Sequence, residues 1–285
     1  MIPYDADKTR SFYDAYGSIE WDRLEVTAYG RLKAIIHADF IGRYVASGDR
    51  VLDAGSGPGR FSIVAANLGA KVTVLDLSAS QLQIAREKIG QAGLMENAED
   101  FVHGDITDLS IFPDGQFDAA ICYGGALSYV CERRHEAAAE LVRVVRPGGA
   151  ILISVMSRYG ASLNLVRRPS MPILKDAEGW DVWGVIEDGD LPGFPSVQVN
   201  MRHPPMHMFT SEELRDFLPG CHVLEIAGSN VTAYEGSAAI EEISKDCRAW
   251  ETAVGLEREL NSRPGLVDTG SHIIMAARRT GQYGS

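Results

Sequence analysis

Residues 51–59 read V-L-D-A-G-S-G-P-G, a mostly apolar run followed by three glycines within five positions. The apolar run predicts a buried strand. The glycines predict a tight turn, because Gly55, Gly57 and Gly59 can adopt the positive φ that other residues avoid. A helix expected from about residue 60 would direct its N–H groups and its positive dipole end back at this turn. We therefore predict a loop that holds a polar or anionic ligand group at the edge of an α/β sheet.

A second acidic residue ends the next expected strand. Residues 71–77 read K-V-T-V-L-D-L, which places Asp76 about 20 residues downstream of Asp53. A carboxylate at this position can accept hydrogen bonds from the two hydroxyls of a ribose. The glycine spacing is G-x-G-x-G, whereas dinucleotide-binding loops have G-x-G-x-x-G. The two runs together predict a site for a nucleoside-containing ligand.

Five stretches, in this order and at this spacing, resemble the class I S-adenosylmethionine-dependent methyltransferases. Besides the two runs above, they are H-G-D-I at 103–106, F-D-A-A-I-C-Y at 117–123 and R-P-G-G-A-I-L at 146–152. The resemblance implies that the cofactor is S-adenosylmethionine and that S-adenosylhomocysteine is its product. Transfer of the methyl group from this cofactor is an in-line displacement, in which positioning supplies much of the rate.

The resemblance also implies which residues contact the cofactor. Asp76 is expected to hold the ribose, and Asp105 with Ile106 the adenine. We expect Arg31 to bind the methionyl carboxylate in a bidentate fork. A solvated helix arginine and a turn-forming aspartate remain the alternative interpretations of Arg31 and Asp105. The full expected set is Arg31, Asp53, Gly55, Ser56, Gly57, Gly59, Asp76, Leu77, Gln81, Asp105, Ile106 and Cys122.

Alternating strand and helix signals predict an α/β fold over the whole chain, 1–285, as a single methyltransferase domain. We predict a Rossmann-like, seven-stranded, mostly parallel sheet with helices on both faces. The resemblance implies that the last strand enters antiparallel beside strand six. The expected strands are 50–54, 71–76, 99–102, 117–123, 150–156, 222–227 and 272–278, and the late helices are 209–218, with a capping box, and 237–260.

Two segments lie outside this alternation. Residues 1–46 form a predicted N-terminal helical arm, which is either a lid over the cofactor or a helix packed on the sheet. Residues 157–208 form a predicted cap insertion for the substrate, an irregular stretch rich in Pro, Gly, Trp and Met. Long irregular stretches are usually functional elements. Trp180 and Trp183 either line an acceptor pocket or pin the insertion to the body.

The acceptor and the catalytic base are the least determined parts of this interpretation. Tyr123, His207 and Tyr16 are the candidate catalytic residues, although no spacing singles one out. The acceptor atom is oxygen, nitrogen or sulfur. A protein that binds the cofactor without turnover is a further alternative. His203 and His207 have a metal-ligand spacing, but the two prolines between them forbid a regular helix, so we predict no metal.

The tail from about 156 to 279 resembles the carboxymethoxyuridine methyltransferases that modify a tRNA wobble base. That function requires a basic surface, because affinity for phosphates falls steeply without cationic contacts. The 157–208 insertion carries more acidic than basic residues, and the chain has a net charge of −12 and a pI near 5.0. We therefore favour a small-molecule acceptor and keep tRNA as the alternative.

Composition indicates an ordinary globular protein. The four cysteines form no C-x-x-C pair, which predicts reduced thiols rather than disulfides or a zinc site. The sequence shows no secretory signal and no apolar run of membrane-spanning length. We therefore expect a cytoplasmic protein without membrane contact, as a monomer or homodimer.

Overall fold

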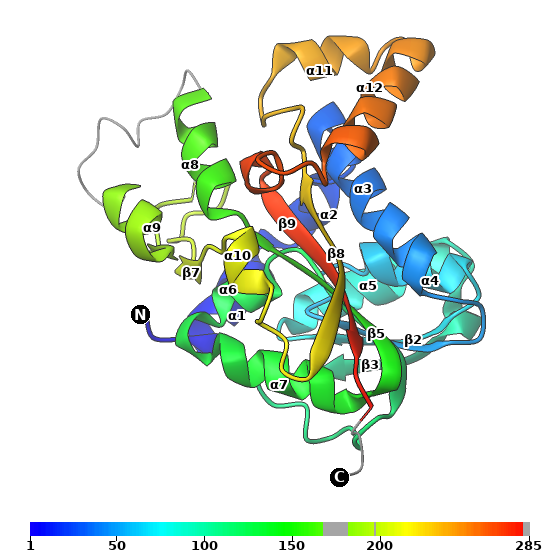
Figure 1. Cartoon of the computed structure of the whole chain (residues 1–285). Helices are drawn as coiled ribbons and strands as arrows, with labels where there is room; N and C mark the ends of the chain where they lie inside the picture. Colours follow the sequence, from blue (N-terminus) through cyan, green and yellow to red (C-terminus); the bar gives the residue numbers. More distant parts are fainter. Residues whose placement is uncertain (168–181, 197, 282–285) are drawn as a thin grey trace.

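The computed structural model describes residues 1–167, 182–196 and 198–281. Its main sheet has seven strands in the order β3-β2-β1-β4-β5-β9-β8 (Figure 1). Neighbouring strands pair in parallel from β3 to β5, whereas β9 runs antiparallel to both β5 and β8. The predicted fold class and antiparallel last strand are confirmed. The strands are β1 (Arg50–Ala54), β2 (Lys71–Asp76), β3 (Ala98–His103), β4 (Phe117–Cys122), β5 (Val145–Met156), β8 (Cys221–Ser229) and β9 (His272–Arg279).

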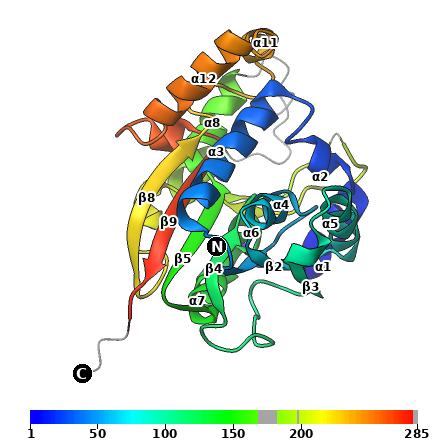
Figure 2. The same cartoon turned by 90° about the vertical axis from the view of Figure 1, so that its right-hand side faces the viewer.

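Helices cover both faces of the sheet (Figure 2). The helices α3 (Ala28–Tyr44), α4 (Arg60–Asn67) and α5 (Ala79–Gln91) share one apolar cluster with one face. The other cluster contains α7 (Arg134–Val144) and the short helix α10 (Ser211–Leu214). Within β1, Val51 belongs to the first cluster and Leu52 to the second, because successive side chains of a strand point to opposite faces.

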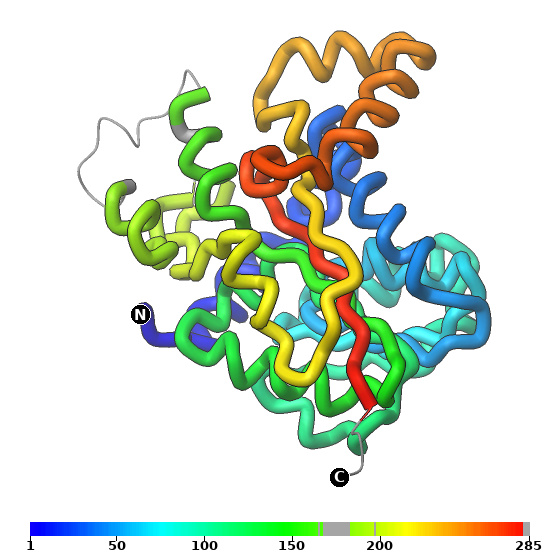
Figure 3. Tube along the Cα trace, in the orientation of Figure 1, coloured from blue at the N-terminus to red at the C-terminus, as the bar shows by residue number. Residues whose placement is uncertain are grey.

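The N-terminal arm lies beside the insertion rather than apart from it. It contains α1 (Ala6–Tyr16), whose N-cap Asp5 accepts from the Lys8 N–H, and α2 (Ile19–Asp22). The Phe12 ring, which is buried, lies 4.8 Å from the His203 ring of the insertion. Figure 3 shows the N-terminal segment beside the insertion along the Cα trace.

The insertion is more regular than the sequence suggested. The helices α8 (Arg158–Arg167) and α9 (Val182–Asp188) precede a hairpin of β6 (Asp190–Leu191) and β7 (Met206–His207). The prediction of an irregular stretch was therefore wrong for residues 158–167 and 182–188, while the described residues between β6 and β7 form no helix or strand of the main elements. Trp183 is 76% exposed and does not pin the insertion to the body, while Trp180 lies outside the described residues.

Three other boundaries differ from prediction. The expected helix over 237–260 is two helices, α11 (Ala238–Ile243) and α12 (Cys247–Leu260), because Asp246 caps the second by accepting from the Ala249 N–H. The fifth strand begins five residues early, at Val145. The capping box of Thr210 and Glu213 is confirmed, but α10 ends at Leu214. The remaining short elements are α6 (Ala126–Tyr129), η1 (Met95–Asn97), η2 (Cys131–Arg133) and η4 (Val267–Thr269).

None of the described helices is both long and apolar enough to cross a membrane.

Candidate active site

The glycine-rich loop after β1 contains glycines with different surroundings. A Cβ added at Gly55 (φ +72°) would lie 2.5 Å from the Ala126 Cβ, so this glycine permits close packing of two loops. A Cβ added at Gly57 (φ +54°) would meet Glu20 Cγ at 3.9 Å, which is an ordinary contact. Gly57 therefore leaves open space beside the loop backbone, where a ligand can approach.

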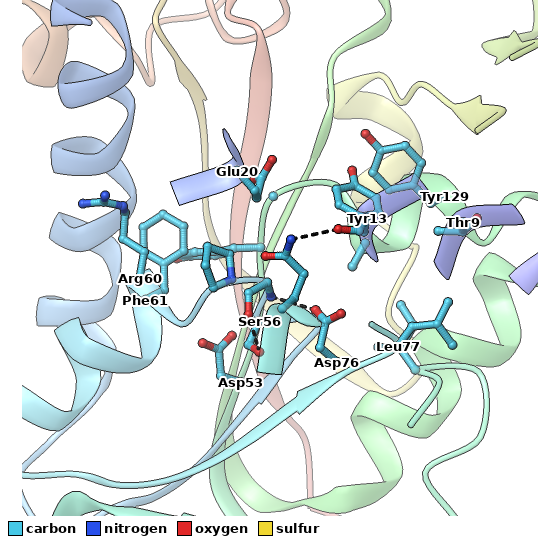
Figure 4. Close-up of a pocket in the computed structure, with 18 of the residues that line it drawn as sticks. Thr9, Tyr13, Glu20, Asp53, Ser56, Arg60, Phe61, Asp76, Leu77 and Tyr129 are labelled. Carbon is cyan, nitrogen blue, oxygen red and sulfur yellow. Dashed lines mark hydrogen bonds between the residues drawn. The ribbon is translucent and has the colours of Figure 1, made fainter. Parts of the chain in front are cut away.

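A cavity of about 110 Å³ lies beside this loop, at the carboxyl ends of β1, β2 and β4. Ligands bind at this edge in open α/β sheets. Figure 4 shows Asp53, Ser56 and Asp76 on the sheet side of the cavity, with the side chains of the N-terminal arm opposite. Nine of the twelve residues expected to contact a cofactor line it: Asp53, Gly55, Ser56, Gly57, Asp76, Leu77, Gln81, Asp105 and Ile106.

Asp76, at the end of β2, fixes the shape of the glycine loop. Its Oδ2 accepts from the Gly57 N–H at 2.7 Å, and its Oδ1 accepts from the Ser78 N–H at 2.8 Å. Burial raises the pKa of Asp76 to about 6, although these two N–H groups favour the ionised form. The carboxylate thus both holds the loop and faces the cavity.

Asp53 joins β1 to α4. Its Oδ2 accepts from the Ser62 hydroxyl at 2.5 Å, and burial raises the pKa of Asp53 to about 7. This hydrogen bond holds the first helix after the loop against the first strand. Asp53 therefore fixes the position of the glycine-rich loop by joining the strand before it to the helix after it.

Asp105 lies at the other end of the cavity, after β3. Its Oδ1 accepts from the Thr107 N–H and hydroxyl, each at 2.9 Å, so part of this carboxylate does form a turn. Its Oδ2 accepts from the Tyr4 hydroxyl at 2.8 Å. The N-terminal segment thus closes the cavity at Asp105, and Ile106 supplies an apolar wall beside it.

The arm is held over the cavity by hydrogen bonds to the start of α5. The Gln81 Nε2 donates to the Tyr13 and Gly17 carbonyl oxygens, both at 3.0 Å. The Ser78 hydroxyl donates to Asp14 Oδ1 at 2.5 Å. Gln81 is fully buried, and its Oε1 has no hydrogen-bond partner among the described residues. An acceptor atom in the cavity wall is therefore still available.

Replacing Gln81 by alanine is expected to loosen this arm. The change removes two hydrogen bonds, each contributing about 0.5–1.5 kcal/mol. Amide hydrogen exchange across residues 6–17 should therefore accelerate by about 5–150-fold, while exchange in β1 and β4 stays slow. Gln83→Ala, on the exposed face of the same helix, is the matched control, because the Gln83 side chain is exposed and donates to Glu87 of its own helix. Equal exchange in the two variants would contradict the role given to Gln81.

Sequence reasoning missed an ion pair in the cavity wall. Glu20 and Arg23 line the cavity from the arm, and the Arg23 Nε and Nη2 donate to the two Glu20 carboxylate oxygens. The side chains are only 15% and 32% exposed. Their spacing of three residues in a helical segment was the available signal, because such residues are neighbours on a helix surface. Tyr129 and Arg60 also line the cavity and were not predicted.

Three expected cofactor residues lie outside the cavity. The Arg31 guanidinium donates to the Glu25 and Val26 carbonyl oxygens and lies over the Trp250 ring, so α3 directs it toward α12. The Cys122 side chain is fully buried in the core. Gly59 (φ +79°) allows α4 and α5 to approach each other. The prediction that Arg31 binds the methionyl carboxylate was therefore wrong, because its guanidinium points away from the cavity.

The three candidate catalytic residues do not come together. Tyr16 stacks on the Phe12 ring at 5.4 Å, outside the cavity lining. His207 is buried, and its Nδ1 donates to Asp190 Oδ1 at 2.7 Å within the insertion hairpin. Tyr123 does line the cavity, but its hydroxyl is buried and has no hydrogen-bond partner among the described residues. Tyr16 and His207 are therefore displaced from the site.

Among the described residues, no group of three or more His, Cys, Asp or Glu side chains could hold a metal ion. The described part of the cavity lining offers four carboxylates and two guanidinium groups. Both guanidinium groups are ion-paired, Arg23 with Glu20 and Arg60 with Glu25. Each guanidinium group among the described lining residues therefore already has a carboxylate partner.

Residues 51–149, which build this cavity edge, match the family described as methyltransferase domain. The chain is 37% identical over 110 residues to a malonyl-[acyl-carrier protein] O-methyltransferase of Serratia marcescens, a match covering 39% of each protein. It is 38% identical over 122 residues to a demethylmenaquinone methyltransferase of Clavibacter sepedonicus, covering 43% of this chain and 46% of that protein. The chain thus matches less than half the length of these relatives.

Two solved structures share the fold over nearly the whole chain. One is a chain from the complex between the Haloferax volcanii Trm112 methyltransferase activator and a methyltransferase. The match has a TM-score of 0.60 and 20% sequence identity, and it covers 97% of this chain and all of that chain. The other is the [4+2]-cyclase SpnF, with a TM-score of 0.59 and 20% identity over 98% of each chain. The similarity to carboxymethoxyuridine methyltransferases is not confirmed by these comparisons. Residues 51–149 therefore match a methyltransferase domain, and the chain as a whole shares the fold of these two solved structures.

Proposed function

We propose that this protein binds S-adenosylmethionine and transfers its methyl group to a small molecule. The observation that carries the proposal is the Asp76 carboxylate, which meets the open backbone at Gly57 in a cavity built by the family's own domain. A sugar diol is the ligand group that such a carboxylate at the end of the second strand receives.

The cavity residues fit this cofactor in three places. Asp76 would hold the ribose hydroxyls, and Gly57 leaves room for the methionyl chain. The Gln81 Oε1, buried without a described partner, is an acceptor for a ligand N–H. Glu20 and Arg23 present one carboxylate and one guanidinium to the cavity, which complements the ammonium and carboxylate of an amino acid. We assign the methionyl end to this pair, in place of Arg31.

The cofactor supplies an electrophilic methyl group, so the protein's task is to position the acceptor in line with it. The arm, residues 1–46, would act as a lid through Tyr4 and Gln81, whose hydrogen bonds hold it at both ends of the cavity. The insertion, 157–208, would cap the acceptor side, where His203 contacts Phe12. Closure by these two segments would exclude water from the reacting groups.

We favour a small-molecule acceptor over tRNA on charge. The lining carboxylates outnumber the guanidinium groups, and the whole chain is acidic. The relatives named for malonyl-[acyl-carrier protein] and demethylmenaquinone methyl transfer match only part of this chain. The name of the cyclase neighbour shows that this fold also supports other chemistry. The acceptor therefore has to be tested directly.

The test is calorimetric titration with S-adenosylhomocysteine, followed by transfer of a radiolabelled methyl group to a panel of metabolites. Binding together with transfer to a small molecule supports the proposal. Absence of binding contradicts it. Salt-sensitive binding of total tRNA with methyl transfer to a uridine would favour the alternative. Binding without transfer to any compound would favour a non-catalytic protein or other chemistry.

Affinity for S-adenosylhomocysteine is expected to rise with pH. The ionised Asp76 is the stronger acceptor for ribose hydroxyls, and burial raises its pKa to about 6. Between pH 5 and pH 7 the affinity should therefore increase by about tenfold and then level off. The same raised pKa has the opposite effect on folding: as pH rises from about 4 to 6, ionisation favours the unfolded chain. Titrations at four pH values test this, and a flat profile would contradict it.

A further inference from the structure

The ion pair that we assign to the methionyl end of the cofactor lies on a very short helix. Glu20 belongs to α2, and Arg23 follows directly after it. The helix has four residues, none of them buried, and its N-cap Ser18 makes no side-chain hydrogen bond. A helix of this length is not stable by itself, because ordering its first turn costs more conformational entropy than its few hydrogen bonds offset. Contacts with other elements must therefore hold α2 over the cavity.

The segment around α2 is anchored at both ends. Before the helix, the Gly17 carbonyl oxygen accepts from the Gln81 Nε2 at 3.0 Å. After the helix, Leu24 is buried in the apolar cluster that also contains residues of α3 and α4. These two anchors fix the path of the segment, but they do not fix the direction in which the side chains between them point.

The ring of Trp21, in the middle of α2, is held by cations from two other helices. The Arg60 Cζ of α4 lies 3.9 Å from the ring centroid, and the Lys88 Nζ of α5 lies 4.5 Å from it. A cation this close to an aromatic face is attracted to it, and indole is the best aromatic partner. The Arg60 Nη2 also donates to the Trp21 carbonyl oxygen at 3.1 Å. Both the side chain and the backbone of Trp21 are thus restrained, and α2 lies beside α4 and α5 (Figure 2).

The restrained indole determines where its neighbours on the helix point. Residues one or two positions apart do not share a helix face, whereas residues three apart do. Glu20 and Arg23 are three apart, so they lie on one face and Trp21 lies on another. With the indole directed at α4 and α5, Glu20 and Arg23 line the cavity. Figure 4 shows Glu20 across the cavity from Ser56 and Asp76.

Arg60 also connects α2 to the glycine-rich loop. It is the first residue of α4 and follows directly after Gly59, the last glycine of the loop. On the other side of the cavity mouth, Glu20 Cγ is the nearest heavy atom to a Cβ added at Gly57. The loop and the helix with the ion pair therefore face each other, and the contact between Arg60 and Trp21 ties them together.

We propose that Trp21 is a positioning residue for the amino-acid end of the cofactor. Held by Arg60 and Lys88, its ring turns Glu20 and Arg23 toward the ammonium and carboxylate groups of the methionyl moiety. Trp21 is not among the residues that line the cavity, so it acts through the ion pair. This inference rests on the proposed function and adds the residue on which recognition of the amino-acid group depends.

Two ligands separate this role from general support of the fold. S-adenosylhomocysteine carries the amino-acid group, whereas 5′-methylthioadenosine has the ribose and the adenine without it. In calorimetric titrations of the unaltered protein, S-adenosylhomocysteine should bind at least about tenfold more tightly. Trp21→Leu should weaken its binding by about 10–150-fold, which corresponds to the loss of one charge-assisted hydrogen bond. The affinity for 5′-methylthioadenosine should change by less than about twofold, because its binding groups lie away from the pair.

Trp250→Leu is the matched control for this variant. The Arg31 Cζ lies 5.8 Å from the Trp250 ring centroid, so this indole also contacts an arginine, but it belongs to α12 and does not line the cavity. Trp250→Leu should bind both ligands as the unaltered protein does. Trp21→Phe keeps an aromatic face for the two cations, and it should bind S-adenosylhomocysteine within about fivefold of the unaltered protein.

Should Trp21→Leu fail to fold, Lys88→Met replaces it. This change removes one of the two cations and leaves the indole in place, so S-adenosylhomocysteine should bind about 2–5-fold more weakly while 5′-methylthioadenosine binds as before. Arg86→Met is the control, because Arg86 belongs to the same helix and its Cζ lies 4.1 Å from the ring centroid of Phe101, outside the cavity lining.

The outcomes separate this inference from the proposed function. Equal losses for the two ligands in Trp21→Leu, or no loss for either, would overturn the role of Trp21 and leave the cofactor site standing. Equal affinities of the unaltered protein for the two ligands would mean that Glu20 and Arg23 do not hold the amino-acid group, which overturns the inference as well. If the unaltered protein binds neither ligand, the proposed function is contradicted and the inference with it.

Discussion

Replacing Asp76 by alanine is expected to abolish measurable binding of S-adenosylhomocysteine. The change removes both charge-assisted hydrogen bonds proposed for the ribose, each contributing about 1.5–3 kcal/mol. The combined loss of about 3–6 kcal/mol corresponds to a 10²–10⁴-fold weaker affinity. Isothermal calorimetry with S-adenosylhomocysteine measures it. Undiminished affinity would exclude Asp76 as the ribose ligand and would contradict the cofactor site.

The variant also leaves the Gly57 and Ser78 N–H groups without their acceptor, so a folding effect has to be separated from a binding effect. Asp76→Asn keeps one acceptor oxygen for these groups and should retain the fold with an intermediate affinity. Asp100→Ala, at an exposed carboxylate of β3 that accepts from the Phe101 N–H, is the control and should bind normally. Thermal melts of all three variants separate the two effects.

The sheet could be predicted because its determinants are local. Each parallel strand is a short apolar run bounded by turn residues, and the expected ranges 50–54 and 71–76 match β1 and β2. The bounds of the late helices were predicted less accurately, because the point where one helix ends and the next begins depends on a single capping side chain. Asp246 interrupts an amphipathic pattern that reads as continuous over 237–260. The helices of the insertion, α8 and α9, could not be predicted for a similar reason, because no strong helix-capping signal marks their ends in the sequence.

The residues of the candidate site likewise divide into those that could be predicted from the sequence and those that could not. Residues at the ends of β1, β2 and β3 reach the cavity because strand ends meet at one edge of a parallel sheet, and these could be predicted by position. Residues of the arm could not, because the path of a segment outside the sheet depends on tertiary contacts. Arg31 faces Trp250, whereas Arg23, one helix earlier, enters the cavity. Both are arginines in helical segments, and only the packing of α3 against α12 distinguishes them.

Replacing Gly57 by valine is expected to block S-adenosylhomocysteine binding while leaving the protein folded. The space beside Gly57 is open, with Glu20 Cγ at 3.9 Å from an added Cβ, so the larger side chain would enter the cavity rather than the core. It would occupy the volume that we assign to the methionyl chain. We expect at least a 10²-fold loss of affinity, since a few tenths of an ångström of overlap already forces the ligand to move.

Gly93→Val is the control for this variant, because Gly93 has a similar backbone conformation and similarly open surroundings. Gly93 also has a positive φ, +73° against +54° for Gly57, and has no heavy atom within 4 Å of an added Cβ among the described residues. Gly93→Val therefore imposes a similar backbone strain, about 1–3 kcal/mol, in the turn after α5 and outside the cavity lining. Both variants should melt at similarly lowered temperatures, but Gly93→Val should keep its affinity. Equal affinities for the two would mean that the ligand does not pass beside Gly57, and the loop would then serve only to join β1 to α4.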